Sequence, residues 1–148
     1  PRSDWSSDVC SSDLEWGLLD ENNVRIRQEL VSSGESLLKK LRGEKRENLK
    51  RFIAMFRFEL LLGEVDRAMM PAFILKKKEV QGEKINGSQE YMDAYRLLVS
   101  APVKEMFDTY MERVHSRGEL GVLSSLNQRV WREYNDLKIY LENKIKEK

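Results

Sequence analysis

The sequence has little cysteine, histidine or proline, and it has no long hydrophobic run. Its 148 residues include one Cys, one His and three Pro. A lone Cys cannot form an intrachain disulfide, and one His with one Cys gives little material for a zinc site of the usual kind. The most apolar stretch, residues 52–62, is interrupted by Arg57 and Glu59 and is far shorter than the roughly 18 uncharged apolar residues typical of a membrane span. These shortages exclude a disulfide framework and disfavour a zinc site and a membrane-spanning segment.

The composition is that of a folded chain with balanced charge. Hydrophobic residues make up 41% and charged residues 34%, with 26 Lys and Arg against 25 Asp and Glu. A chain of this length buries roughly two-thirds of its unfolded surface when it folds as one domain. Its apolar content is too high for an obviously disordered protein. We therefore expect one globular domain with no strong electrostatic preference for a partner.

The first residues differ in character from the rest of the chain. Residues 4–14 read DWSSDVCSSDL, which resembles one translated reading frame of a common short-read sequencing adapter. We therefore expect residues 1–14 to be a disordered, non-native tail and set them aside. Residues 15–148 are then a single helical domain, expected to be the C-terminal part of a longer protein. Cys10 carries no functional information in this interpretation, so thiol chemistry is excluded.

The remaining sequence predicts an all-α fold, a five- or six-helix bundle with a buried central helix. Asp20 and its neighbours supply side-chain acceptors for a helix that continues to about Gly43. The central helix is predicted from about residue 44 to 70, and Pro71, which lacks an N–H, is expected to kink or restart it. Apolar residues occur most of the way round this helix, which is typical of a buried one. They are Leu49, Phe52, Ile53, Phe56 and Leu60 on one side and Met55, Phe58, Leu62, Val65 and Met69 on the other.

Three further helices follow a loop at residues 81–87. Ser88 is a candidate N-cap for the first, and Pro102 suits the first turn of the second. Ser116 and Glu119 match the capping box, in which each side chain accepts a hydrogen bond from the other residue's backbone N–H. The last helix carries an apolar residue every 3.7 positions on average, as an ordinary amphipathic helix does. Its stripe is Leu123, Leu126, Val130, Tyr134, Leu137, Leu141 and Ile145.

Charged residues within the central helix form the first candidate site. A helix that is apolar on nearly every side cannot expose all of them to water, so some must be paired. We expect internal ion pairs with packed helices, for which Arg96, Arg113 and Arg129 are available. A ligand-binding carboxylate and a charged partner interface are the alternatives. The charged residues are Arg57, Glu59, Glu64, Asp66 and Arg67, which flank Gly63.

A basic cluster forms the second candidate site, because phosphate backbones attract such clusters. Glutamates are interspersed with the basic residues, and no DNA- or RNA-binding signature accompanies them. A solvated face is therefore favoured over a nucleic-acid site. The cluster comprises Lys39, Lys40, Arg42, Lys45, Arg46, Lys50 and Arg51, and a shorter one is formed by Lys76, Lys77 and Lys78.

The sequence predicts no catalytic, cofactor or metal site. Glu112 and His115 have the i, i+3 spacing found in carboxylate-bridged metal bundles, but no second copy of that motif is present. No phosphate-binding glycine loop or nucleophile elbow occurs. We therefore expect a non-catalytic, cytoplasmic helical module that binds a protein, either the missing upstream part or a helical partner. The alternatives are the C-terminal region of an enzyme with an upstream active site, and a weak nucleic-acid-binding domain.

Overall fold

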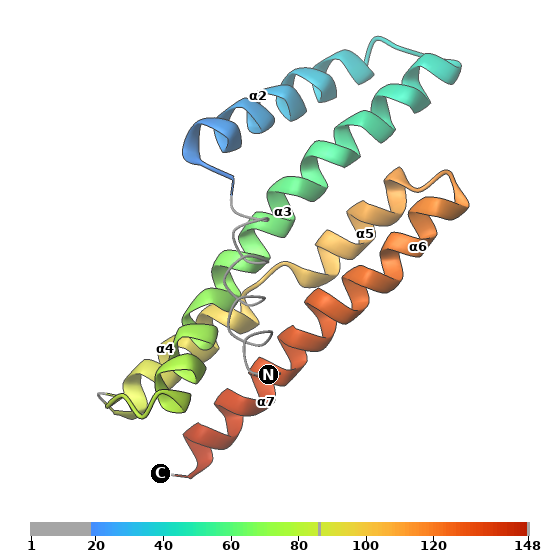
Figure 1. Ribbon diagram of the computed structural model, residues 1–148. Coiled ribbons are helices and arrows are strands. Elements are labelled where there is room, and N and C mark those ends of the chain that lie inside the picture. Colours follow the sequence, from blue (N-terminus) through green and yellow to red (C-terminus); the bar gives the residue numbers. More distant parts are fainter. Residues whose placement is uncertain (1–18, 86, 148) are drawn as a thin grey trace, which may run out of the picture. The chain divides into compact units, whose positions relative to one another are not determined.

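The computed structural model describes residues 19–85 and 87–147, and within these ranges it contains helices and no strand (Figure 1). This confirms the all-α class. The adapter-like segment, with Cys10, lies outside the described residues. In chain order the helices are α2 (Glu21–Leu38), α3 (Gly43–Val80), α4 (Ser88–Val99), α5 (Val103–Arg113), α6 (Arg117–Leu126) and α7 (Arg132–Lys146), and the π-helical segment η1 (Asn127–Trp131) joins α6 to α7.

The chain divides into two compact units. Of the described residues, the first contains residues 19–66 together with Val103–Val114, and the second contains those of residues 67–102 and 115–147. The expected single bundle of five or six helices is therefore not what the structure shows. A physical reason is the length of α3, whose 38 residues make a helix about 57 Å long. The 11-residue α5, which packs on α3 in the first unit, covers only part of that length.

In the first unit, α2 and α3 are joined by a short turn and pack closely. The side chain of Asp20 accepts a hydrogen bond from the Asn23 backbone N–H at 2.8 Å and so caps α2, as the sequence predicts. Gly34 is buried against α3, where a Cβ atom added to it would lie 2.7 Å from Ile53 Cγ1. The absence of a side chain at Gly34 thus allows the two helices to approach each other.

Helix α3 is buried along one stripe and not on every side, so the expected buried central helix is not matched. Phe52 and Ile74 are about half exposed, although both belong to its apolar pattern. Neighbouring helices cover mainly one line of side chains, at alternating steps of four and three residues that keep to one side of a helix. Ile53, Asp66 and Met69 are buried beside this line. The buried residues on this line are Ala54, Phe58, Leu61, Val65, Ala68, Ala72 and Leu75. The helix continues through Pro71 without ending there.

Aromatic rings join α3 to α5 in the first unit. The rings of Phe58 and Tyr110 meet edge to face with their centroids 5.1 Å apart. The guanidinium of Arg113 lies over both rings, 5.7 Å from the Phe58 centroid and 5.1 Å from that of Tyr110, which is a favourable cation–π geometry.

In the second unit α4 packs against α7. Leu98, Leu137 and Leu141 are fully buried there. The predicted capping box is present, since Ser116 and Glu119 exchange hydrogen bonds at the start of α6. Across the described residues, no helix is both long and apolar enough to cross a membrane.

Candidate functional site

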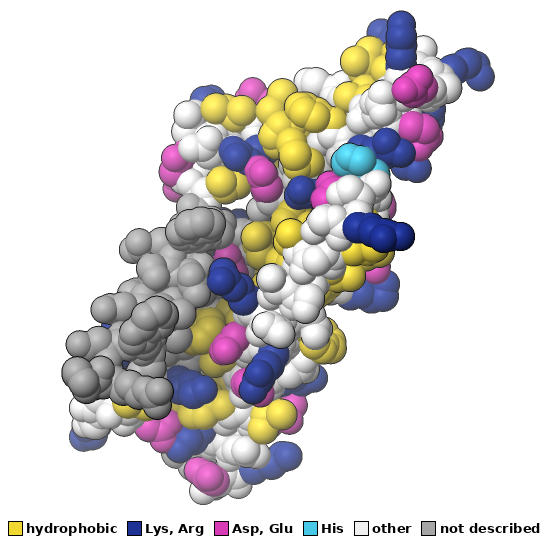
Figure 2. Space-filling view, turned by 45° about the vertical axis from the view of Figure 1, so that its right-hand side comes forward, with side chains coloured by type: hydrophobic (Ala, Val, Ile, Leu, Met, Phe, Trp, Pro, Cys, Tyr) yellow, Lys and Arg dark blue, Asp and Glu magenta, His cyan; other side chains and the backbone are white. Residues whose placement is uncertain are grey.

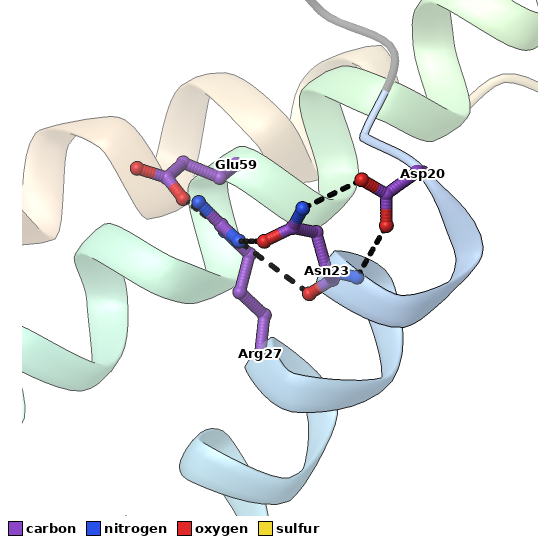
Figure 3. A network of polar contacts seen from close by, with 4 residues as sticks. All are labelled: Asp20, Asn23, Arg27 and Glu59. Atoms are coloured by element: carbon purple, nitrogen blue, oxygen red, sulfur yellow. Dashed lines mark hydrogen bonds and ion pairs between the residues drawn. The ribbon is translucent and has the colours of Figure 1, made fainter.

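Two of the five charged residues predicted to form a network on α3 are paired with α2. The Arg27 Nε–H donates a hydrogen bond to Oε2 of Glu59, and the Arg57 guanidinium donates one to Glu35. The Arg27 guanidinium also donates a hydrogen bond to the side-chain oxygen of Asn23, at 3.2 Å, as Figure 3 shows. The Glu59 pair is therefore part of a chain of contacts that leads back to the start of α2.

The other three charged residues of this group differ in their exposure to solvent. Glu64 and Arg67 are exposed on α3, whereas Asp66 is buried with a residue exposure of 9%. No buried side-chain nitrogen or oxygen within the described ranges lacks a hydrogen-bond partner. The side chains of the α2–α3 pairs are 21% to 49% exposed, and ion pairs at such sites contribute little to stability.

Sequence reasoning missed Arg27 and Glu35 as the partners. It proposed arginines from later helices because those helices were expected to surround α3. The signal that would have identified α2 is the short connection at residues 39–42, since helices joined by a short loop are antiparallel neighbours. The connection identifies the neighbouring helix but not the register, because Glu35 lies 3 residues before the end of α2 whereas its partner Arg57 lies 14 residues into α3.

The basic cluster is brought together only in part. Lys39, Arg42 and Arg46, with Leu41 and Gly43, line an open hollow of about 340 Å³ where α2 turns into α3, here called the basic hollow. The Arg46 guanidinium donates a hydrogen bond to the backbone oxygen of Leu38, so it also closes the turn.

The remaining basic residues do not all share one face with the hollow. On α3, Lys50 lies about 40° from Arg46, whereas Lys45 and Arg51 lie about 100° and 140° from it. Lys45, Lys50 and Arg51 are exposed on α3, and at 100° per residue they are spread widely around the helix. Lys40 is exposed in the turn and does not line the hollow.

An exposed apolar surface, which sequence reasoning did not locate, runs along the α2–α3 hairpin. Figure 2 shows apolar side chains gathered over this part of the molecule. Phe52 is also in contact with Phe56, with their ring centroids 4.9 Å apart. We call this surface the hairpin stripe. It comprises Ile26 (41% exposed), Leu30 (43%), Leu37 (46%) and Phe52 (52%).

The four members of the hairpin stripe lie on the same side of the hairpin. The contact between Gly34 and Ile53 marks the line along which α2 and α3 meet. At 100° per residue, the three α2 members lie about 40° to 80° to one side of Gly34, and Glu35 lies about 100° to the other. Phe52 and Arg57 likewise lie on opposite sides of Ile53. Because Glu35 pairs with Arg57, those two share one side of the hairpin, and the stripe shares the other.

A second polar cluster connects α3 to α7 in the second unit. The Tyr140 hydroxyl donates to Oε2 of Glu79 at 2.6 Å, and the Lys144 ammonium donates to Oε1 of the same carboxylate. The hydrogen bonds from Lys144 and Tyr140 lower the pKa of Glu79. The hydrogen bond to Glu79 is the main cause of the raised pKa of Lys144. Burial, followed by the hydrogen bond to Glu79, raises the pKa of Tyr140 well above its ordinary value. All three groups keep their ordinary charge at neutral pH, which suits a structural contact.

The candidate metal pair is not assembled into a site. His115 lies at the start of α6, with Nδ1 3.1 Å from Oε2 of Glu119, while Glu112 is exposed on α5. The hydrogen bond from the His115 backbone N–H is the main cause of the lowered pKa of Glu119. In residues 19–85 and 87–147, no group of three or more His, Cys, Asp or Glu is placed to hold a metal ion.

The π-helical segment η1 is a further feature that sequence reasoning missed. Such segments often mark functional positions in helices. Here η1 ends at Trp131, which is nearly half exposed and stacks on Tyr134 with the ring centroids 6.0 Å apart.

Comparison of the chain with protein family models, with curated proteins and with solved structures gives no match in any of the three.

Proposed function

We propose that this chain is a non-catalytic helical interaction module that binds a protein through the hairpin stripe. The supporting observation is the exposure of four large apolar side chains on one side of two adjacent helices. Scattered apolar residues are normal on a protein surface, but a contiguous apolar patch marks an interaction site. The adjacent Glu59 and Lys45 add charged groups at the edges of the stripe, as is usual at the rim of a protein interface.

The proposal is tested by replacing stripe residues with polar ones in dilute, purified protein. We expect the Leu30→Ser/Phe52→Ser variant to bind less of an environment-sensitive apolar dye than the unaltered chain does. Its free energy of unfolding should fall by only about 1 kcal/mol per site, because each side chain is already about half exposed. Dye fluorescence and urea denaturation measure the two quantities.

The matched control is Ile53→Ser, because Ile53 neighbours Phe52 but is only 3% exposed. Burying an unpaired hydroxyl there and losing apolar packing should cost several kcal/mol. If the double variant lost as much stability as this control, the stripe would belong to the core and the proposal would be wrong. Equal dye binding by the variant and the unaltered chain would also contradict it.

Binding of nucleic-acid phosphates at the basic hollow is the second candidate function. The observation that favours it is the convergence of Lys39, Arg42 and Arg46 on one hollow without an acidic lining residue. Affinity for a short oligonucleotide should then fall steeply as salt concentration rises. Lys39→Glu/Arg42→Glu should abolish that binding, whereas Lys76→Glu/Lys77→Glu, at the far end of α3, should leave it nearly unchanged. Equal effects of the two double variants would exclude a specific role of the hollow.

A further inference from the structure

Three residues of α3 are spaced seven positions apart along the edge of the hairpin stripe. They are Lys45, Phe52 and Glu59. Seven residues make nearly two full turns, so successive members lie within about 20° of each other around the helix and about 10.5 Å apart along it. One side of α3 therefore carries a cation, a half-exposed aromatic ring and an anion in that order.

This order is self-complementary under a two-fold rotation. An axis that passes at Phe52, perpendicular to α3, reverses the direction of the helix. It places Lys45 of each copy opposite Glu59 of the other, and Phe52 next to its own equivalent. A parallel arrangement in register would instead bring like charges together. Two-fold interfaces are built in this way, with the same patch on both subunits.

We propose that a second copy of this chain docks on the hairpin stripe, with the two α3 helices antiparallel about Phe52. This inference rests on the proposed function, because it names the partner that the same surface binds. The apolar residues of α2, namely Ile26, Leu30 and Leu37, flank the contact, so two hairpins stacked face to face bury them together. Two antiparallel helix pairs arranged in this way form a four-helix arrangement with a shared apolar centre.

The pair between Arg27 and Glu59 is compatible with this contact. Arg27 binds the Oε2 atom of Glu59, and the Glu59 side chain remains 35% exposed. Its second oxygen, Oε1, can accept a hydrogen bond from Lys45 of the second copy. Charge complementarity of this kind selects one partner and one orientation more than it adds affinity.

Sedimentation velocity of the full chain over a wide concentration range tests the proposal with two charge reversals. The unaltered chain should form dimers. Lys45→Glu and Glu59→Lys each place two like-charged pairs in the dimer, so each variant alone should dimerise roughly tenfold more weakly. An equimolar mixture should restore dimers, because the mixed pair regains opposite charges at both contacts.

Two further variants complete the design. Arg51→Glu reverses an exposed charge about 100° from Phe52 on the same helix, and it should leave dimerisation unchanged. Phe52→Ala removes the central ring without altering charge and should weaken the dimer by tenfold or more. Phe52 is half exposed, so this variant should fold normally, as circular dichroism can verify.

A chain that stays monomeric at every concentration would overturn the second-copy proposal. Dimers that are insensitive to Phe52→Ala, or that the variant mixture fails to restore, would do the same. The dye-binding test of the stripe is independent of these results. An exposed, dye-binding stripe on a strictly monomeric chain would retain the interaction module and reject only the second copy as its partner.

Discussion

At Gly34, the absence of a Cβ atom determines how closely α2 and α3 pack. A Cβ atom there would lie 2.7 Å from Ile53 Cγ1 and 2.9 Å from Cδ1. These separations are well below the 3.5–4.0 Å at which carbon atoms attract each other. Ile53 is almost fully buried, so it has little room to move away. The glycine therefore has a packing role that outweighs its poor helix propensity.

We predict that Gly34→Ala destabilises the protein and that Gly121→Ala stabilises it. Alanine is intrinsically better than glycine in a helix by about 0.5–1 kcal/mol. At Gly121, on α6, nothing lies within 4 Å of the added methyl, so this gain should be obtained in full. At Gly34 overpacking costs about 1–3 kcal/mol, so a net loss of about 1 kcal/mol is expected. Urea denaturation of both variants measures the difference, and a stabilised Gly34→Ala would mean that Ile53 moves aside without cost.

Sequence reasoning at this scale identified charged residues but not their partners. The need for pairing on α3 follows from its apolar composition alone, and Arg57 and Glu59 are indeed paired. Their partners, Glu35 and Arg27, depend on which helix lies against α3 and at which register. The neighbouring helix and its register depend on the close packing of Gly34 against Ile53. In the sequence, Gly34 appears only as a residue that is unfavourable in a helix.

Between elements, the contact of Glu79 with Tyr140 and Lys144 connects the end of α3 to α7. The pKa of Glu79 is lowered from its ordinary 4.5 by the hydrogen bonds from Lys144 and Tyr140. A folded-state pKa below the unfolded one means that folding favours the ionised carboxylate. Its contribution to stability is therefore fully present above pH 4.5, and it is lost as the pH falls through the lowered folded-state pKa.

We predict that Glu79→Gln lowers the free energy of unfolding at pH 7 and has almost no effect at strongly acidic pH. The Glu79 and Lys144 side chains are 36% and 27% exposed, so solvent screening limits the loss to about 1 kcal/mol or less. Urea denaturation at several pH values measures the difference between variant and unaltered chain. Glu83→Gln, in the exposed segment after α3, serves as the control and should show no such dependence. A Glu79→Gln deficit that persists in acid would indicate a packing defect in place of a lost charge contact.

Some helix boundaries with a local chemical signal could be predicted, and features that depend on neighbours could not. The prediction of Ser88 as an N-cap is wrong, because Ser88 is the first residue of α4 and Gly87 precedes it without a side-chain cap. Asp20 and Ser116 are N-caps in the structure because their side chains satisfy backbone N–H groups within three residues. The segment η1 left no comparable signal. The apolar residues in and around it, Leu126, Val130 and Tyr134, are spaced by four and four. The same spacing recurs at Leu137, Leu141 and Ile145, where the helix is a regular α-helix.

At the scale of the whole molecule, each of the two units is built from two separate segments of the chain. The chain passes from the first unit to the second within α3, returns after Pro102, and leaves again after Val114. Neither unit is a continuous segment that could be excised. The hydrogen-bond ladder of α3 also runs on past Asp66, so unfolding one unit would fray the end of a helix that the other unit needs. The sequence composition favoured one domain. It gave no indication of which segments of the chain would pack together in each unit.

We predict from this connectivity that the two units unfold together. Leu137 is fully buried in the second unit, and Leu137→Ala should cost about 2–5 kcal/mol. If unfolding is cooperative, amide hydrogen exchange at Phe58, in the first unit, should become faster by the same free-energy increment as exchange at Leu98, in the second. Gly121→Ala is a useful counterpart, because it should slow exchange at both amides. Loss of protection at Leu98 with none at Phe58 would instead show that α3 can be folded at one end and frayed at the other, and the two units would then be separate folding units despite their shared helix.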